Sequence, residues 1–415
     1  MRGIHLAILP ATATRDARLL VAARSLRSLG DGLTSVLLPA FLLAAGHSEL
    51  AVGVLSTAAL AGSAALTLAL GLVAHRVAPR STLLAACLLM LLTGLGFAAT
   101  SVFAVLLVVA FVGTLNPSGG DVSVFLPTEQ ALLAGAAAPT QRTALFARYN
   151  LCAALAVAVG ALAAGVPARL ASATGASLVD TSRLTFAGYG LLGIGCALVY
   201  RRLGPATRQA PGASREAPRR TLGPSRGAVL RLTALFSLDS FGGGFVVNSI
   251  LVLWLLSRHG LSLEAAGAVM SAAALLSALS QLGSAPIARR IGLIRTMAFT
   301  HLPANAFLVG AALAPGPRGA IACLLARAAL SQMDVPARQA YVMSLVQPDE
   351  RAAASSVTNV PRSLASAISP TLAGALLGAS SFGWPLVIGG VLKAGYDLLL
   401  LAGFRHREPA DERAE

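Results

Sequence analysis

Apolar stretches of about twenty residues recur along the whole chain, and this feature limits the fold more than any other. An α-helix needs about 20 apolar residues to cross the hydrocarbon core of a bilayer. On that measure the sequence predicts twelve spans. They cover residues 20–45, 50–74, 81–100, 102–136, 142–166, 184–202, 229–257, 264–288, 294–314, 319–346, 351–378 and 383–404. We therefore expect an all-α membrane protein with twelve transmembrane helices.

The composition excludes a soluble globular protein. Hydrophobic residues make up 56% of the 415 residues and charged residues only 12%, with a mean hydropathy of +0.74. Soluble domains carry about 25% charged residues. The net charge of +15 comes almost entirely from arginine, because Lys393 is the only lysine. With 5% aromatic residues and no basic stripe beside stacking residues, nucleic acid is not an expected partner.

No cofactor, metal or enzymatic machinery is predicted. The four cysteines are Cys87, Cys152, Cys196 and Cys323, which lie in apolar runs without CxxC spacing. The sequence contains no GxxxxGK[ST], GxSxG or HExxH motif. No cleaved signal peptide is expected at the N-terminus. The abundance of Ala, Gly and Arg favours a bacterial gene, and hence the inner (plasma) membrane.

A polar, proline-rich segment divides the spans into two sets of six. It predicts an N-terminal bundle at 1–202, a linker at 203–228, a C-terminal bundle at 229–404 and a tail at 405–415. With both termini in the cytoplasm, the outer segments hold only four arginines: Arg169, Arg183, Arg258 and Arg318. The many other loop arginines then lie inside. Cytoplasmic loops are enriched in arginine, so we expect an N-in, C-in topology.

An internal repeat relates the two sets of spans. Residues 127–165 align without a gap on 336–374, an offset of 209. The alignment places Pro127 on Pro336, Gln130 on Gln339, Pro139 on Pro348, Arg142 on Arg351 and Asn150 on Asn359. A second match, at offset 214, places Gly53 on Gly267. Two parallel six-helix halves are an architecture that moves a solute by rocking.

The loop between spans two and three carries the best local motif. It reads Gly-Leu-Val-Ala-His-Arg-Val-Ala-Pro-Arg over residues 71–80. This resembles the pattern G-x-L-A-D-R-x-G-R-[RK] of the major facilitator superfamily of secondary transporters, with matches at Gly71, Ala74, Arg76 and Arg80. His75 stands where the family has an acid that helps to latch one conformation. The resemblance covers essentially the whole chain and implies the twelve-span fold with two six-helix bundles.

The resemblance also gives an indication of direction. In the family, antiporters carry G-P-x-x-G-G in span five. Here span five has Gly160 and Gly165 at that place, and span eleven has Pro370 and Gly374. Small residues at this spacing also let helices approach closely. The partial match favours export over uptake.

Acidic residues inside the spans are the candidates for proton coupling. Charged groups within a bilayer are costly and usually face a cavity or a partner. Asp31 and Asp239 lie beside glycines in spans one and seven, and Glu129 lies near the middle of span four. Asp121 follows the helix-breaking run 116–120, which predicts a kink in span four. Each acid can equally be half of a structural ion pair.

Other polar residues are candidates for lining a substrate cavity. These residues are Arg148, Asn150, Asp334, Arg338, Asn359 and Arg362. Glu129 and Arg148 stand at similar depths, so the sequence predicts that they pair. Asp334 and Arg338 are four residues apart on one helix, which predicts a second pair. Lys393 and Asp397 predict a third, whereas His301 beside Pro303 is expected at a helix end.

Together these features favour a proton-coupled secondary transporter that exports a small organic solute. The two halves rock around a cavity built from spans one, four, seven and ten, and solute, protons and lipid are its expected partners. We expect a monomer. Two alternatives keep the fold: an uncoupled facilitator or lipid mover, and a membrane sensor or assembly partner that transports nothing.

Overall fold

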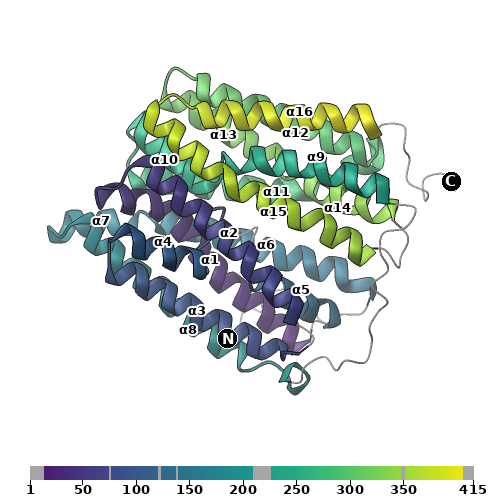
Figure 1. The fold of residues 1–415 in the computed structure, drawn as a ribbon, viewed down its shortest axis with the longest axis horizontal. Helices are drawn as coiled ribbons and strands as arrows, with labels where there is room; N and C mark the ends of the chain where they lie inside the picture. Colours follow the sequence, from purple (N-terminus) through teal and green to yellow (C-terminus); the bar gives the residue numbers. More distant parts are fainter. Residues whose placement is uncertain are drawn as a thin grey trace, which may run out of the picture.

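The computed structural model describes residues 14–73, 76–119, 123–136, 139–208, 226–346 and 351–404, and within these ranges it is helical without a β-strand (Figure 1). The N-terminal half contains α1 (Arg15–Ala44), α2 (Glu49–Val73), α3 (Pro79–Ala99), α4 (Phe103–Val112), α5 (Leu126–Gly135), α6 (Pro139–Ala163), α7 (Val166–Thr174) and α8 (Leu178–Tyr200), followed by the 3₁₀ turn η1 (Pro205–Arg208). The C-terminal half contains α9 (Arg226–Gly244), α10 (Asn248–His259), α11 (Leu263–Ile291), α12 (Leu293–Leu313), α13 (Pro317–Leu330), α14 (Asp334–Leu345), α15 (Arg351–Ala379) and α16 (Trp384–Phe404).

Nine helical segments of the described chain are long and apolar enough to cross a membrane, and α4 is a shorter apolar helix. The all-α membrane fold is thus confirmed, but the predicted spans do not map one to one onto single helices. Span four is divided into α4 and α5, and span ten into α13 and α14. The predicted kink in span four is confirmed, because residues 113–119 are not helical. Span six starts earlier than expected, at Leu178, where Ser177 caps the helix.

The breaks in the spans have local causes. Between α4 and α5, the Asn116 side chain accepts hydrogen bonds from the backbone and hydroxyl of Ser118, which forms a turn in place of a helix. Pro117 follows Asn116 and cannot donate to a helical ladder. Gly119 has a φ of 81°, a conformation that suits glycine. Span four therefore bends in the middle of the molecule.

The helices pack first within each half and then across the interface between the halves. In the N-terminal half α1 packs on α6 and α8, and α3 packs on α8. The corresponding helices of the C-terminal half pack in the same way, with α9 on α15 and α16 and α12 on α16. Two long contacts join the halves, α2 with α15 and α6 with α11. Figure 1 shows α15 lying beside α2 along the middle of the bundle.

Glycines allow the two halves to approach closely at one end. We call this the far end; it holds the last residue of α1, Ala44, and lies opposite the terminal end, where α1 starts and α16 finishes. A Cβ atom on Gly53 would lie 2.3 Å from the carbonyl oxygen of Pro370. A Cβ atom on Gly267 would lie 2.6 Å from the carbonyl oxygen of Ala161. Larger side chains at Gly53 or Gly267 would therefore force the halves apart.

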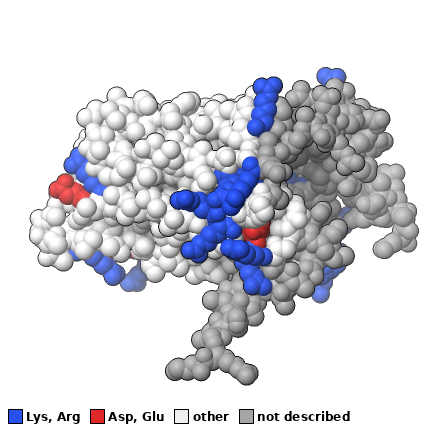
Figure 2. All heavy atoms as spheres, turned by 90° about the horizontal axis from the view of Figure 1, so that it is seen from below, with Lys and Arg blue, Asp and Glu red and all other residues white. Residues whose placement is uncertain are grey.

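The outside of the molecule carries the apolar surface that a bilayer requires. Large hydrophobic side chains are exposed on several helices, including Leu92 on α3, Leu184 and Leu198 on α8, and Val391 on α16. Figure 2 shows a broad uncharged band with charged side chains on either side of it, and most of them are arginines gathered on one side. Exposed apolar area of this extent would cause aggregation in water. Lipid acyl chains solvate it instead.

Candidate functional site

A buried ion pair forms the centre of the N-terminal half. The Arg27 guanidinium on α1 donates a hydrogen bond to the Glu129 carboxylate on α5 across 2.7 Å. The hydroxyl of Tyr149 on α6 donates to the same carboxylate across 2.6 Å, and the hydroxyl of Tyr200 on α8 donates to its other oxygen. The Glu129 side chain is completely buried. Four helices are thus tied together by one fully satisfied carboxylate.

Asp31 lies one turn along α1 from Arg27, and its carboxylate has fewer polar partners than that of Glu129. Its only ion pair with a described residue is with Arg27, at 3.6 Å. The Oδ2 atom of Asp31 is buried and accepts no hydrogen bond from any described residue. A buried charged oxygen without a donor is costly. Asp31 is therefore the carboxyl group of this half for which the protein supplies the least compensation.

The predicted pairing of Glu129 with Arg148 is wrong. The two residues do stand at similar depths, but the partner of Glu129 is Arg27, which α1 inserts between the helices. Arg148 lies seven residues before Leu155 on α6, so the two side chains share a face, and Leu155 is exposed. The Nη1 atom of Arg148 is buried and makes no hydrogen bond within the described chain. The prediction used only the depth of each residue in the membrane, and depth does not tell which face of α6 Arg148 occupies.

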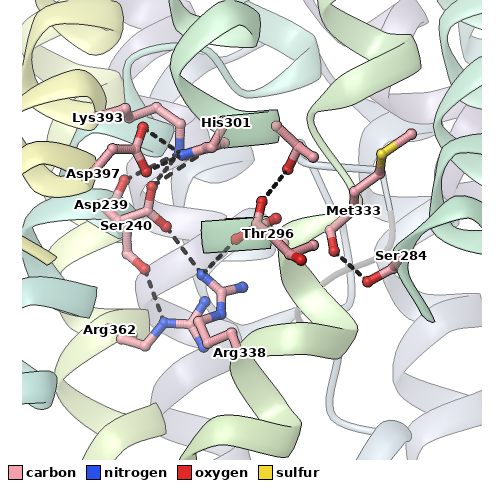
Figure 3. Close-up of polar contacts among 12 residues, drawn as sticks. Asp239, Ser240, Ser284, Thr296, His301, Met333, Arg338, Arg362, Lys393 and Asp397 are labelled. Carbon is pink, nitrogen blue, oxygen red and sulfur yellow. Dashed lines mark hydrogen bonds and ion pairs between the residues drawn. The ribbon is translucent and has the colours of Figure 1, made fainter. Parts of the chain in front are cut away.

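The C-terminal half contains a larger cluster around Asp239 (Figure 3). The Asp239 carboxylate on α9 accepts hydrogen bonds from Lys393 on α16, at 2.6 Å, and from Arg338 on α14, at 3.1 Å. Arg338 also pairs with Asp334 at 3.4 Å, as the sequence predicts. All four side chains are nearly inaccessible to solvent. The carboxylate of Asp239 thus joins three helices.

A histidine extends this cluster toward α12. His301 Nδ1 lies 3.0 Å from the Asp397 carboxylate, and the Asn305 amide donates to Asp397 across 2.9 Å. His301 Nε2 lies 4.0 Å from Asp239, so the imidazole stands between two carboxyl groups. The expected Lys393–Asp397 pair is wrong, because Lys393 reaches Asp239 on the neighbouring helix. The expected helix-end position of His301 is also wrong: Pro303 lies inside α12 without ending it, and His301 is buried.

Arg362 on α15 borders the cluster without pairing with any described carboxylate. Its Nε donates to the hydroxyl of Ser240 at 3.2 Å, and its Nη1 donates to the side-chain oxygen of Asn359 at 3.3 Å. The guanidinium carbon lies 6.0 Å from the ring centre of Phe236. Arg338 lies 5.6 Å from the centre of the same ring. Two guanidinium groups therefore contact one aromatic side chain. Figure 3 shows the two arginines next to each other.

The internal repeat keeps a charged residue at the same position in both halves but reverses the sign of its charge. The alignment places Glu129 of α5 on Arg338 of α14. Glu129 pairs with a base on α1, the first helix of its half. Arg338 pairs with an acid on α9, the first helix of the other half. Equivalent helices are thus joined by an ion pair in each half, α1 with α5 and α9 with α14. The base lies on the first helix of the N-terminal half, and the acid lies on the first helix of the C-terminal half.

Asn150 and Asn359 occupy equivalent positions in the two halves. Both are exposed although both lie well inside long helices. Exposed apolar residues follow Asn150 after five and nine positions (Leu155, Val159), and follow Asn359 after the same intervals (Leu364, Ile368). Those intervals correspond to rotations of about 140° and 180° around a helix. Each asparagine therefore faces away from the apolar outer surface and toward the space between the halves.

The remaining predicted residues lie elsewhere. Asp121 and His75 are outside the described residues. Gly71 and Arg76 are exposed at the terminal end, and Arg80 there lines a surface hollow of about 370 Å³ with Ser81, Leu84 and Arg208. The sequence analysis did not single out Tyr149, Tyr200 or Asn305. Asn305 is a polar side chain inside an apolar run, which is the signal that marks it. Tyr149 lies between Arg148 and Asn150, and Tyr200 precedes Arg201, so no such signal marks the tyrosines.

This architecture, with long apolar helices in two related halves and buried ion pairs between the helices of each half, defines a polytopic membrane protein of the transporter type. Comparison with protein families agrees with it. Residues 20–333 match the model of the Major Facilitator Superfamily, and the chain belongs to this family. Membership makes the chain an integral membrane transporter and not an enzyme.

Known relatives and structures resemble the chain over nearly its full length. An uncharacterised membrane protein of Saccharomyces cerevisiae is 26% identical over 428 residues, covering 94% of each chain. The nucleoside transporter NupG has a TM-score of 0.72 at 14% identity, over 94% of this chain and 99% of that one. The xylose transporter XylE of E. coli, in a partially occluded inward open conformation, has a TM-score of 0.72 at 13% identity, over 94% and 98%. At such identities the structures support the fold alone.

Proposed function

We propose that this protein is a proton-coupled secondary transporter that exports a small organic solute by alternating access. The observation that carries this proposal is the pair of buried acid–base clusters, one in each half, on the helices that correspond to spans one, four, seven and ten. Ionisable groups are retained within a membrane where they serve a transport path or a proton relay. The exposed Asn150 and Asn359 supply neutral hydrogen-bonding groups beside both clusters.

The contacts between the halves support alternating access. At the far end the hydroxyls of Ser56 and Ser249 lie 3.0 Å apart, and those of Thr57 and Thr371 lie 2.8 Å apart. The backbone N–H of Ser249 donates to the carbonyl of Pro117 at 3.1 Å. We assign both termini to the cytoplasm, because the loop arginines concentrate at the terminal end and cytoplasmic loops are enriched in arginine. The far end then faces the outside, so these contacts close the path on that side, and we propose that the solute enters between the two halves from the cytoplasmic side.

Asp31 is the foremost candidate for the proton site. Its environment holds Arg24 and Arg27 on α1, Glu129 on α5 and Tyr189 on α8. No described residue donates a hydrogen bond to it, whereas Glu129 has three donors and Asp239 has two. A proton taken up by Asp31 removes a weakly compensated buried charge and leaves Glu129 as the one described carboxylate that is paired with Arg27. The proton therefore changes the balance of charge on α1, which packs against both halves.

Direction and location follow from weaker features. Gly160 and Gly165 stand in span five, where antiporters of the family carry their motif, and Pro370 and Gly374 stand at the equivalent place in span eleven, which supports export. The arginine-rich composition supports a bacterial inner membrane. The contacts between the two halves of one chain leave no need for a second copy, so we propose a monomer.

Transport into proteoliposomes tests the proposal. The purified chain is reconstituted, a pH gradient is imposed, and flux of a broad panel of radiolabelled small solutes is measured. We expect at least one solute to accumulate against its gradient only when the pH gradient is present. Flux that ignores the pH gradient would indicate a facilitator. Ligand binding without flux would indicate a sensor, and either outcome would contradict the proposal.

A further inference from the structure

Among its described residues, the C-terminal half holds four cationic side chains and three carboxyl groups in its interior or at the border of it. Arg338, Lys393, Asp239, Asp334 and Asp397 are buried, and Arg327 and Arg362 are partly buried. The carboxyl groups are taken by Lys393, Arg338 and His301. Arg362 is left with two neutral oxygen acceptors. A partly buried cation without an anion is unfavourable, so the site is incomplete as the described residues supply it.

Arg362 and Arg338 stand close enough to act on one group. Both guanidinium carbons lie within 6.0 Å of the Phe236 ring centre, and the charge of Arg338 acts on Arg362. Each guanidinium presents five N–H donors in a planar fork. Arg362 uses two of them on Ser240 and Asn359. The remaining donors match the paired oxygens of a carboxylate or phosphate group.

The face that Arg362 occupies is accessible to a solute. Arg362 is half-buried, and Asn359, its hydrogen-bond partner one turn earlier on α15, is exposed. The exposed apolar side chain of Leu364 lies two residues beyond Arg362, about 200° around the helix. Arg362 therefore points away from the lipid-facing surface and toward α9 and the space between the halves, where Ser240 and Phe236 lie.

We propose that Arg362 and Arg338 bind an anionic group of the transported solute, a carboxylate or a phosphate. The bound anion balances the excess positive charge of the C-terminal half, and Asn359 and Ser240 hold Arg362 in place to receive it. The inference rests on the proposed transport function and names the chemical class of its substrate. Anion binding is nevertheless measurable without transport, so the two claims fail separately.

The test uses inorganic phosphate as the probe on the full-length chain in a neutral detergent. Thermal unfolding is followed in sodium phosphate and in sodium chloride of equal ionic strength. A ligand that binds the folded state raises the unfolding midpoint. We expect phosphate to raise the midpoint more than chloride does, and Arg362→Gln to abolish this difference. Arg362→Lys, which keeps the charge but loses the planar guanidinium, should retain part of the difference between phosphate and chloride.

Arg183→Gln is the matched control, because Arg183 is a partly exposed arginine at the far end whose contacts are Asp180 and Ser101. It should keep the full phosphate effect. An equal effect of phosphate and chloride on the wild-type chain, or an undiminished effect in Arg362→Gln, would overturn the proposal. A shift caused by phosphatidylglycerol vesicles but not by phosphate would assign the site to a lipid headgroup and also overturn it. Phosphate binding without flux of any solute would preserve the anion site and contradict the transport function.

Discussion

The guanidinium of Arg27 donates to the carboxylate of Glu129 across 2.7 Å, and the two side chains are 2% and 0% exposed. Removing one partner of a buried pair leaves the other as an uncompensated charge, which costs about 3–5 kcal/mol. We therefore expect Arg27→Met to lower the unfolding midpoint in detergent strongly. The double variant Arg27→Met, Glu129→Leu should recover much of the loss. If the double variant were as unstable as the sum of the two single variants, the pair would not be coupled.

Asp31 should determine the pH dependence of transport. Asp31→Asn keeps the size of the side chain and cannot carry a proton in exchange. We expect this variant to bind solute but to lose accumulation driven by a pH gradient, with counterflow retained. Flux in proteoliposomes, measured with equal and with different pH inside and outside, distinguishes counterflow from accumulation driven by the pH gradient. Accumulation at the wild-type level in Asp31→Asn would remove Asp31 from the coupling mechanism, and the same assay on Glu129→Gln would then examine the second candidate.

The hydroxyl contact at the far end should be convertible into a lock. Ser56 and Ser249 are completely buried, and their oxygens lie 3.0 Å apart. Cysteines at both positions, in a chain whose four native cysteines are replaced, should form a disulfide under mild oxidation. We expect the oxidised protein to stop transporting and the reduced protein to resume. Mobility on non-reducing gels after cleavage within the linker measures the cross-link, and each single cysteine variant is the control. Unchanged transport in fully cross-linked protein would show that the far end does not open.

Close packing of α2 on α15 should tolerate no side chain at Gly53. A Cβ atom there would lie 2.3 Å from the backbone oxygen of Pro370, which cannot move aside as a side chain would. Gly53→Val should therefore weaken closure of the far end and favour the opposite conformation. The expected readout is faster labelling of Ser249→Cys by an impermeant thiol reagent added outside. Gly71→Val, at a glycine with open space around it, should leave the labelling rate unchanged.

The two asparagines should contribute to solute affinity rather than to folding. Asn150→Leu and Asn359→Leu remove exposed polar groups, so the unfolding midpoint should change little. A lost hydrogen bond to bound solute of about 1.4 kcal/mol weakens binding tenfold. We expect KM to rise by about that factor in each variant once a solute is identified. Wild-type KM in both variants would show that these side chains do not line the path.

The sequence predicted the class of fold because span length and charge are local properties. The repeat also predicted that Asn150 and Asn359 would correspond, and both lie on the same face of their helices. Partners within the clusters were harder to predict. Glu129 pairs with Arg27 and not Arg148, and Lys393 pairs with Asp239 and not Asp397, because the choice depends on how each helix is rotated against its neighbours. Hydropathy reports the depth of a residue and not its direction, so the sequence did not reveal that Tyr149 and Tyr200 face Glu129.

The ion pairs Arg27–Glu129 and Arg338–Asp239 each join helices of one half, so each pair travels as a neutral unit when one half turns against the other. Moving a single charge through the membrane potential requires about 2.3 kcal/mol per 100 mV. The protein's paired charges therefore add almost nothing to the electrical work of a turnover. The current that accompanies the cycle is then set by the cargo, its protons and side chains such as Arg362 that have no acidic partner among the described residues, and the voltage dependence of flux counts these charges.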